Sequence, residues 1–135
     1  MRIRRFEEIQ AWKAARELVR EIYRLSSHGT FAKDYSLKDQ VQRAAVSAMS
    51  NIAEGFERGT DKEFIQFLIV ARGSIAEVQS QLYVAHDLHY IDEGQFQTLS
   101  TKAAEVGKLI NGFIGYLRVH RMSREIRRSA DKPAG

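Results

Sequence analysis

The chain has 135 residues, of which 44% are hydrophobic and 28% charged, a size and composition typical of one compact domain with a single core. It contains no cysteine, which excludes disulfide frameworks, thiolate zinc sites and cysteine nucleophiles. No segment approaches the roughly 18 uninterrupted apolar residues of a membrane span, and acidic residues stand where a signal peptide would be apolar. We therefore expect a soluble, cytoplasmic protein without a membrane partner.

The net charge of +4 is concentrated at the two ends of the chain. Residues 1–5 contribute three arginines and no acid, and residues 116–135 contribute six basic and two acidic side chains. The remaining residues carry 12 basic and 15 acidic side chains, so the body of the protein is slightly acidic. Basic blocks of this kind are typical either of segments that bind polyanions or of solvated ends.

Helical periodicity runs through nearly the whole chain, and no segment alternates like a strand, which predicts an all-α protein. The first helix is expected over about residues 7–25. After the break around Gly29, Ser36 is the expected N-cap of a second helix. The predicted inner face of the first helix is Ala11, Ala15, Leu18, Ile22 and Leu25.

Turn and capping residues divide the rest of the chain. Gly59 is expected to end the second helix, and Thr60 with Glu63 forms a capping box that begins the third. A second capping box, Asp92 with Gln95, predicts the start of a fourth helix. The third helix shows an unbroken four-three repeat of apolar residues: Phe64, Leu68, Ala71, Ile75, Val78, Leu82 and Ala85.

Four long helices joined by short connections predict an antiparallel, up-down-up-down four-helix bundle. We assign residues 1–120 to the bundle and residues 121–135 to a basic C-terminal helix extension and tail. Several helices carry more apolar residues than one core uses, which predicts self-association. The surplus positions are Trp12, Val19, Tyr23, Ile65, Ile69, Ala76, Tyr83, Leu109 and Tyr116.

A stripe of small residues at steps of four also marks the fourth helix: Ala103, Gly107, Asn111 and Gly115. Small side chains let another helix approach closely. The approaching helix could belong to the same bundle or to another subunit.

Polar residues interrupt the apolar pattern of the second and third helices at Arg43, Asn51, Glu54, Arg58, Arg72 and Glu77. Half-buried charges persist only when they are paired and hydrogen-bonded. The main interpretation is a network that fixes helix register or a subunit interface. Contact with a ligand or nucleic acid, and an active site in the same cluster, are the alternatives.

Other chemistry has weaker support. No histidine has a glutamate three positions before it, which excludes the paired motif of a bundle di-iron site. His86 and His89 lie near Asp92 and Glu93, but histidines at a helix end are usually ordinary surface residues. The segment from Gly55 to Gly59 lacks the Lys-Ser/Thr of a phosphate-binding loop. We therefore predict no cofactor, no metal and no enzymatic activity.

The terminal arginines are the candidate nucleic-acid contacts. If the fourth helix continues, basic residues recur at three- and four-residue steps and form one ridge, to which the N-terminal arginines add a second basic group. Few aromatic residues alternate with them, which favours contacts to the phosphate backbone over base stacking. The candidates are Arg2, Arg4, Arg5, Arg118, Arg121, Arg124, Arg127 and Arg128.

Motifs over about residues 6–118 resemble the bacterial four-helix-bundle proteins encoded in intervening sequences of 23S ribosomal RNA genes. They are Phe6, Trp12, Ala15 and Ile22-Tyr23; Arg43-Ala44-Ala45-Val46-Ser47 and Ser50-Asn51-Ile52-Ala53-Glu54-Gly55; and Lys62-Glu63-Phe64, Ala71-Arg72-Gly73-Ser74 and Glu77. That family is similar in fold to the accessory variability proteins of diversity-generating retroelements.

The resemblance implies a homo-oligomer, a fivefold ring, that binds nucleic acid, RNA or DNA, and brings no established reaction with it. A protein-interaction scaffold that docks a protein partner, such as an RNA-processing or reverse-transcribing enzyme, is the alternative.

Overall fold

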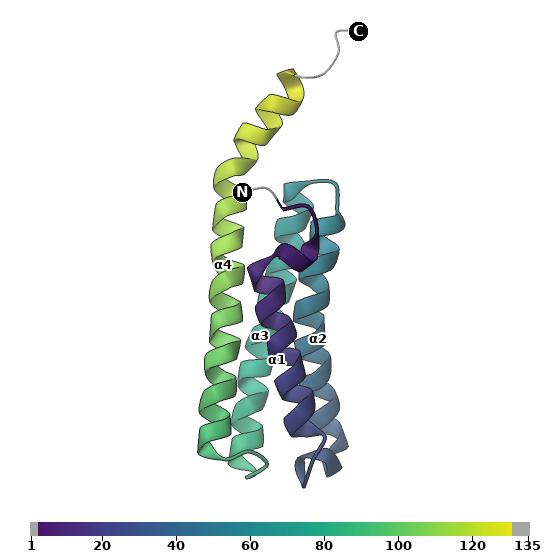
Figure 1. Ribbon diagram of the computed structural model, residues 1–135, viewed down its shortest axis with the longest axis vertical. Coiled ribbons are helices and arrows are strands. Elements are labelled where there is room, and N and C mark those ends of the chain that lie inside the picture. The colour runs from purple at the N-terminus through teal and green to yellow at the C-terminus, as the bar shows by residue number, and fades with distance from the viewer. Residues whose placement is uncertain (1–2, 131–135) are drawn as a thin grey trace.

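A computed structural model describes the backbone of residues 3–130 and the side chains of residues 3–120. It contains four α-helices, α1 (Gln10–Ser26), α2 (Tyr35–Glu57), α3 (Asp61–Asp87) and α4 (Glu93–Ala130), and two short 3-10 helices, η1 (Phe6–Glu8) and η2 (Phe31–Lys33). Each helix packs against the next in the chain and α1 also packs against α4, which gives an up-down-up-down bundle (Figure 1). No strand occurs between residues 3 and 130, so the expected fold class is confirmed.

The first helix begins later than the periodicity indicated. Residues Phe6–Glu8 form the 3-10 turn, Ile9 is extended (φ −74°, ψ 123°), and α1 starts at Gln10. The reason is packing at this end of the core: Ile9 is buried, and the Phe6 ring lies edge-on to Trp12 with the ring centroids 5.1 Å apart. If α1 began at residue 7, the 3-10 turn that brings Phe6 onto Trp12 would be lost.

The predicted cap at Ser36 is wrong, because Asp34 is the N-cap of α2. One carboxylate oxygen of Asp34, Oδ1, accepts the backbone N–H of Leu37 at 3.1 Å. The other, Oδ2, accepts the Tyr90 hydroxyl at 2.9 Å from the turn between α3 and α4. The Tyr90 ring stacks on Phe31 at 5.4 Å. The start of α2 is therefore set by a contact between residues 56 positions apart, which local sequence does not show.

Of the other two capping predictions, the Asp92–Gln95 box is confirmed in full and the Thr60–Glu63 box in its Thr60 half. Thr60 Oγ1 accepts the backbone N–H of Glu63 at 3.2 Å and begins α3. At the start of α4, Gln95 N donates to Asp92 Oδ1 at 2.8 Å and Asp92 N donates to Gln95 Oε1 at 2.9 Å, which is a complete capping box. Three residues separate α2 from α3, and this short turn holds the two helices antiparallel.

The helices α2 and α3 pack tightly at Gly55. A Cβ atom built on Gly55 would lie 2.6 Å from the Cβ of Phe67 and 2.9 Å from the ring of Phe64. Gly55 therefore allows these two helices to pack with their backbones closer than any larger residue permits. No helix in the described part of the chain is both long enough and apolar enough to cross a lipid bilayer.

Two of the positions assigned to surplus apolar surface belong to the core. Trp12 is 8% exposed, because the Phe6 ring of η1 packs against it, and Ile65 is 5% exposed. Tyr23 and Tyr83 are exposed as expected, at 43% and 61%.

The small-residue stripe of α4 changes surroundings along its length. Ala103 is fully buried, and a Cβ on Gly107 would contact Ile75 of α3 at 3.7 Å. Asn111 and Gly115 are exposed, and nothing lies within 4 Å of a Cβ built on Gly115. The first half of the stripe thus packs within the chain, and its second half lies on the surface.

Candidate functional site

The polar residues of α2 and α3 do not form one network. Asn51, on the side of α2 that faces α3, donates from Nδ2 to the Ser47 carbonyl at 2.8 Å and contacts Ser47 Oγ at 3.1 Å. Ser47 Oγ in turn lies 2.9 Å from Ser74 Oγ of α3, which is 8% exposed. These three side chains bridge the two helices with neutral hydrogen bonds. Ser47 and Ser74 are the members that the charge pattern did not single out.

A second contact lies near the end of α2. Arg58 pairs with Glu54 at 2.9 Å, and its guanidinium carbon lies 4.8 Å from the centroid of the Phe67 ring on α3. The two side chains are 46% and 56% exposed, so the ion pair contributes little by itself. The stacking on Phe67 ties the helix end to its neighbour.

The other predicted members point elsewhere. Arg43 pairs with Asp39 on its own helix at 2.9 Å, with 80% of its side chain exposed. Arg72 donates to Asn111 Oδ1 of α4 at 3.0 Å. Glu77 is exposed and makes no ion pair or side-chain hydrogen bond within residues 3–120. The cluster thus divides into a neutral bridge, two local ion pairs, a contact to α4 and a free carboxylate.

The two basic segments of the chain lie at the same end of the bundle (Figure 1). Arg4 and Arg5 are exposed and precede η1, where the backbone N–H of Arg4 donates to Glu8 Oε2 at 2.9 Å. Ile3 and Tyr116 of α4 line the same open hollow, and the exposed Arg118 follows Tyr116 by two residues. Arg2 lies outside the described residues, as do the side chains of Arg121, Arg124, Arg127 and Arg128.

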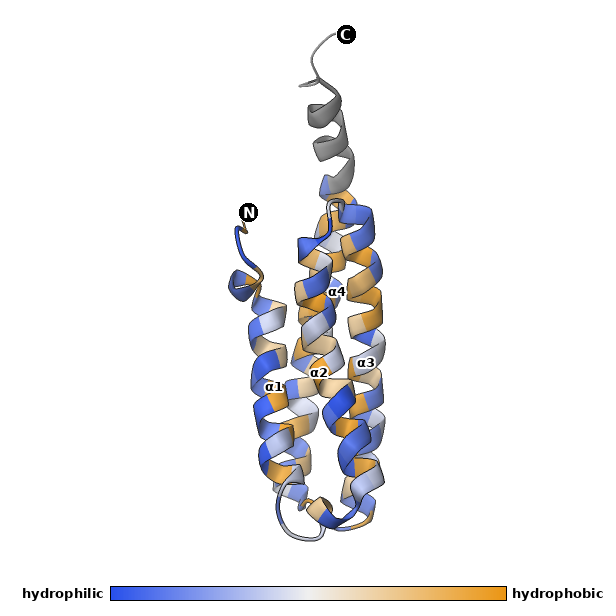
Figure 2. Ribbon diagram, turned by 90° about the vertical axis from the view of Figure 1, so that its right-hand side faces the viewer, coloured by the Kyte–Doolittle hydropathy of each residue, from blue (hydrophilic) through white to orange (hydrophobic). Residues whose placement is uncertain are grey.

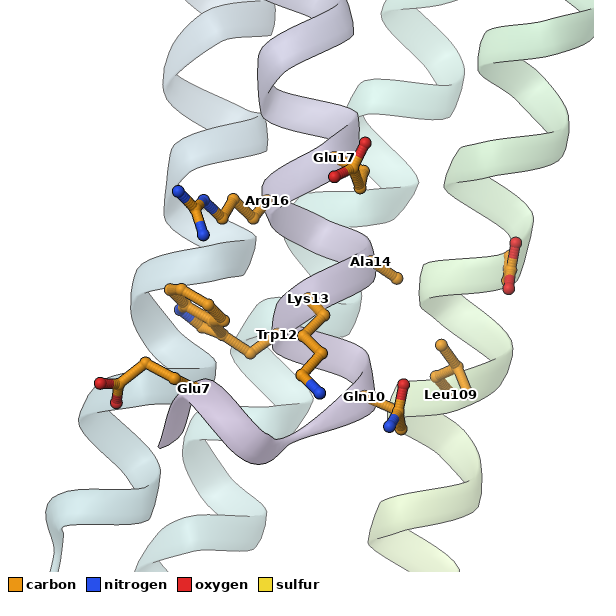
Figure 3. Close-up of a pocket in the computed structure, with 9 residues that line it drawn as sticks. Glu7, Gln10, Trp12, Lys13, Ala14, Arg16, Glu17 and Leu109 are labelled. Atoms are coloured by element: carbon orange, nitrogen blue, oxygen red, sulfur yellow. The ribbon is translucent and has the colours of Figure 1, made fainter. Parts of the chain in front are cut away.

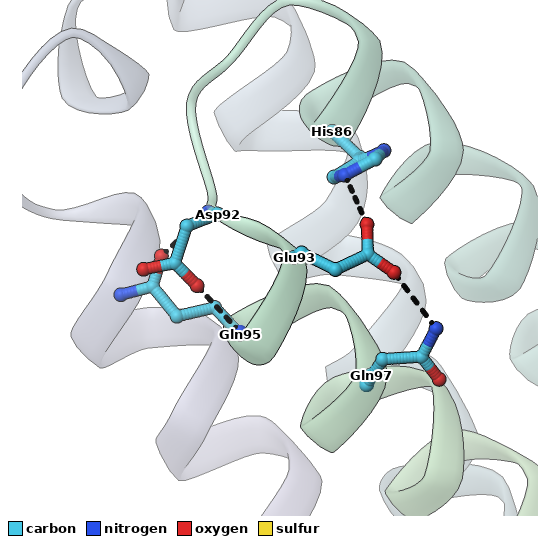
Figure 4. A network of polar contacts seen from close by, with 5 residues as sticks. All are labelled: His86, Asp92, Glu93, Gln95 and Gln97. Carbon is cyan, nitrogen blue, oxygen red and sulfur yellow. Dashed lines mark hydrogen bonds and ion pairs between the residues drawn. The ribbon is translucent and has the colours of Figure 1, made fainter.

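The opposite end of the bundle holds His86. Its Nε2 lies 2.9 Å from Glu93 Oε2, and its ring stacks on Phe96 at 4.7 Å (Figure 4). Glu93 Oε1 also accepts Gln97 Nε2 at 3.0 Å. These contacts join the end of α3 to the start of α4. No group of three or more metal-binding side chains comes together in the part of the chain that the structure describes.

Two acid–base groups near that end are shifted by their hydrogen bonds. The hydrogen bond to Asp34 raises the pKa of Tyr90, with burial and the charge of Asp34 acting in the same direction. The hydrogen bond from Arg24 lowers the pKa of Glu21, a half-buried side chain on α1. Both pKa shifts arise from hydrogen bonds that hold the structure together.

An open hollow lies between α1 and α4. It has a volume of about 770 Å³, and apolar side chains, among them Leu109, Phe113 and Tyr116, form most of its wall. A smaller hollow of about 470 Å³ adjoins it and shares Gln10, Glu105 and Leu109. Figure 3 shows Gln10 of α1 and Leu109 of α4 approaching each other at this junction.

Comparison with known proteins gives one family and one fold. The family model described as 23S rRNA-intervening sequence protein matches residues 7–112. A crystal structure of a protein of unknown function from the S23 ribosomal protein family of Bacteroides thetaiotaomicron VPI-5482 superposes with a TM-score of 0.71 at 21% sequence identity, over 77% of this chain and 97% of that one. No curated protein matches the chain significantly.

Proposed function

Because the chain belongs to the 23S rRNA-intervening sequence protein family, we propose that it is a non-catalytic, oligomeric bundle protein that binds nucleic acid through the phosphate backbone. The observation that supports the proposal is that two basic segments, Arg4-Arg5 and the α4 region at Arg118, lie at the same end of the bundle. The family description makes structured RNA the first ligand to test.

Electrostatics gives this proposal its physical basis. Arginines that neutralise phosphates release condensed counterions, so binding weakens steeply as salt rises and depends little on base sequence. The α2–α3 turn at the same end carries both signs of charge, Glu57 and Asp61 beside Arg58 and Lys62. With Glu54 and Glu63 beside the turn and Glu7 and Glu8 after Arg4 and Arg5, the described residues at this end carry six acidic and five basic side chains. A basic surface there therefore depends on the four arginines between residues 121 and 128.

Assembly would multiply this charge. We propose five subunits, the number that the family resemblance implies, so that five copies of each basic segment act together. Five chains of 15.4 kDa would have a mass of about 77 kDa in solution. Exposed apolar side chains on α3, Val70, Tyr83 and Val84, and Leu88 at its C-cap support self-association.

The test is binding of purified, nuclease-treated protein to structured RNA and duplex DNA across a salt series. Replacing Arg4 and Arg5 by alanine should weaken binding to every sequence and lower the slope of log K against log salt for duplex DNA by about 0.9 for each lost phosphate contact. Arg20→Ala with Arg24→Ala is the matched control, because these exposed arginines lie at the other end of α1. Equal loss in both variants would contradict the assignment.

A protein-interaction scaffold is the second candidate. The exposed apolar side chains on α3 favour it, because they suit a protein surface better than a phosphate backbone. Removing residues 119–135 separates the two candidates. Loss of nucleic-acid binding supports the first, whereas unchanged capture of a purified protein partner by the truncated chain, without nucleic acid, supports the second.

A further inference from the structure

Arg72 of α3 differs from four other arginines of the bundle in the kind of partner that holds it. Those four each pair with a carboxylate three or four residues earlier in the chain: Arg20, Arg24, Arg43 and Arg58. Arg72 instead donates from Nη1 to the amide oxygen of Asn111 on α4 at 3.0 Å, and it makes no ion pair within residues 3–120. A neutral group therefore positions the guanidinium and leaves its charge uncompensated.

A second arginine without an ion pair among the described side chains lies on the same side of α4. Asn111 and Arg118 are seven residues apart, so they project from one side of the helix, about 10 Å apart along its axis. Gly115 lies between them, and nothing is within 4 Å of a Cβ built on it. We call Arg72, Asn111, Gly115 and Arg118, all of which are exposed, the α3–α4 face.

The two helix segments that form this face contain no acidic residue. They are residues 64–76 of α3 and residues 106–120 of α4, in which every lysine and arginine is exposed. The acids that flank these segments point to other sides of their helices. Glu63 and Glu77 lie about 180° and 140° round α3 from Arg72, and Glu105 lies about 120° round α4 from Asn111. A phosphate on this face would therefore meet no carboxylate between the two arginines.

The hollow between α1 and α4 lies on another side of α4. Its wall holds Glu8 and Glu105 as well as Lys108, so its charge is mixed. Figure 2 shows α1 and α3 on opposite sides of the bundle, and α4 packs against both of them. The α3–α4 face is therefore separate from the acids of the hollow.

We propose that the α3–α4 face binds the phosphate backbone of nucleic acid, with Arg72 and Arg118 as the contacts and Asn111 as the residue that positions Arg72. This inference rests on the proposed nucleic-acid binding and adds to it a site along the side of the bundle. The planar guanidinium of arginine matches the oxygens of a phosphate. Because Asn111 already holds Arg72, the side chain loses less rotamer freedom when the ligand arrives, and its other N–H groups can donate to the phosphate.

The arrangement of the cations favours a polymer of phosphates as the ligand. Two arginines in one line along a helix suit a ligand whose charges repeat, and the glycine between them leaves room for its chain. The same helix continues from Arg118 into the basic residues 121–128, so one phosphate backbone can contact both segments. Structured RNA is the first probe, as for the proposed function.

Arg72→Gln in the full-length chain tests the first contact. Titration of a labelled RNA hairpin at about 0.1 M salt should show binding weakened about five- to eightfold, with the slope of log K against log salt lowered by about 0.7–0.9. Arg16→Gln is the matched control, because Arg16 is an exposed arginine of α1 without an ion pair among residues 3–120. The control should keep both the affinity and the slope near those of the wild type.

Asn111→Asp tests the positioning role without changing the shape of the side chain. An aspartate keeps Arg72 in place but neutralises it, so RNA binding should fall at least as far as in Arg72→Gln while Tm does not fall. Gln40→Glu is the control, since it adds the same charge at an exposed position of α2. A merely structural bond between Arg72 and Asn111 predicts RNA binding equal to that of the control.

The outcomes separate this inference from the proposed function. A folded wild-type chain that binds no RNA or DNA at low salt would overturn both. A wild-type chain that binds RNA, with Arg72→Gln and Asn111→Asp each equal to its control, would overturn the α3–α4 face alone. Poly-L-glutamate should displace much less RNA than the same charge of unlabelled RNA does. Equal displacement would assign the face to acidic proteins and contradict the phosphate contact.

The absence of cysteine allows a direct test of proximity. Gly115→Cys, carrying a photoactivated crosslinker, should become attached to bound RNA, because it lies between the two arginines. Thr30→Cys is the control, since Thr30 is exposed and precedes η2, away from the face. Equal crosslinking from the two positions would contradict the inference.

Discussion

Gly55 provides the sharpest test of how α2 and α3 pack. Replacing it by alanine adds a methyl group that would lie 2.6 Å from the Cβ of Phe67 and 2.9 Å from the Phe64 ring. The Phe67 Cβ is fixed to its backbone, so the two helices must separate to make room. The Gly55→Ala chain should therefore be less stable, although alanine is the better helix former.

The magnitude follows from two opposing terms. Alanine in a helix interior stabilises by about 0.5–1 kcal/mol relative to glycine. Inserting a methylene into a well-packed core costs about 1–3 kcal/mol. Because the contact is far inside van der Waals distance, the second term should win, leaving a net loss of about 0.5–2 kcal/mol. For a chain of this size that lowers Tm by about 2–6 °C.

Thermal unfolding at one fixed protein concentration measures the effect, since assembly makes Tm depend on concentration. Gly115→Ala is the matched control, because nothing lies within 4 Å of its added Cβ on α4. That variant should raise Tm by about 2–3 °C. If Gly55→Ala raised Tm as Gly115→Ala does, the close approach of α2 and α3 would be refuted.

Three further predictions concern polar contacts of the bundle. Asp34→Ala should lower the free energy of unfolding by about 1 kcal/mol, because α2 loses its cap on Leu37. Asp34→Asn should retain most of that cap. Urea unfolding measures the free energy of both variants, and equal losses would contradict the capping role of Asp34. The pKa of Tyr90 is raised in the folded chain, so its contribution to stability is complete below the unfolded pKa of about 10 and is lost as pH rises through the folded value. A pH series of melts should show this decline, and Tyr90→Phe should reduce it; an unchanged alkaline decline in the variant would reject the contact. Asn51→Ala should cost about 1 kcal/mol by removing the bonds to Ser47, and no change in Tm would argue against the bridge.

The periodicity and capping residues predicted most of the fold. The four-three repeat of α3 and the Asp92–Gln95 box are local signals, and the structure has both. The cap at Asp34 was missed because it depends on Tyr90, which lies 56 residues away in sequence. The burial of Trp12 was missed for a related reason. The Phe6 ring packs against the Trp12 side chain, and it reaches Trp12 only because η1 ends before α1 begins.

For the polar residues of α2 and α3, residue spacing predicts the direction of a side chain but not its partner on another helix. Helix geometry places Arg72 on the side of α3 away from Ser74, since two residues correspond to about 200° of rotation. If Ser74 faces α2, Arg72 must point away, and it bonds to Asn111 of α4. This part was available from spacing alone. The Ser47–Ser74 bridge was not, because it requires the register of α2 against α3, which spacing within one helix does not give.

The most direct measurement of the central claim is binding of the nuclease-treated wild-type protein to structured RNA and duplex DNA over a salt series, with its solution mass recorded in the same buffers. The account predicts an oligomer whose affinity falls steeply with salt, varies little with sequence, and drops when Arg4 and Arg5 are replaced. An intact oligomer that binds neither nucleic acid at low salt would contradict it and leave the protein-scaffold candidate as the better explanation.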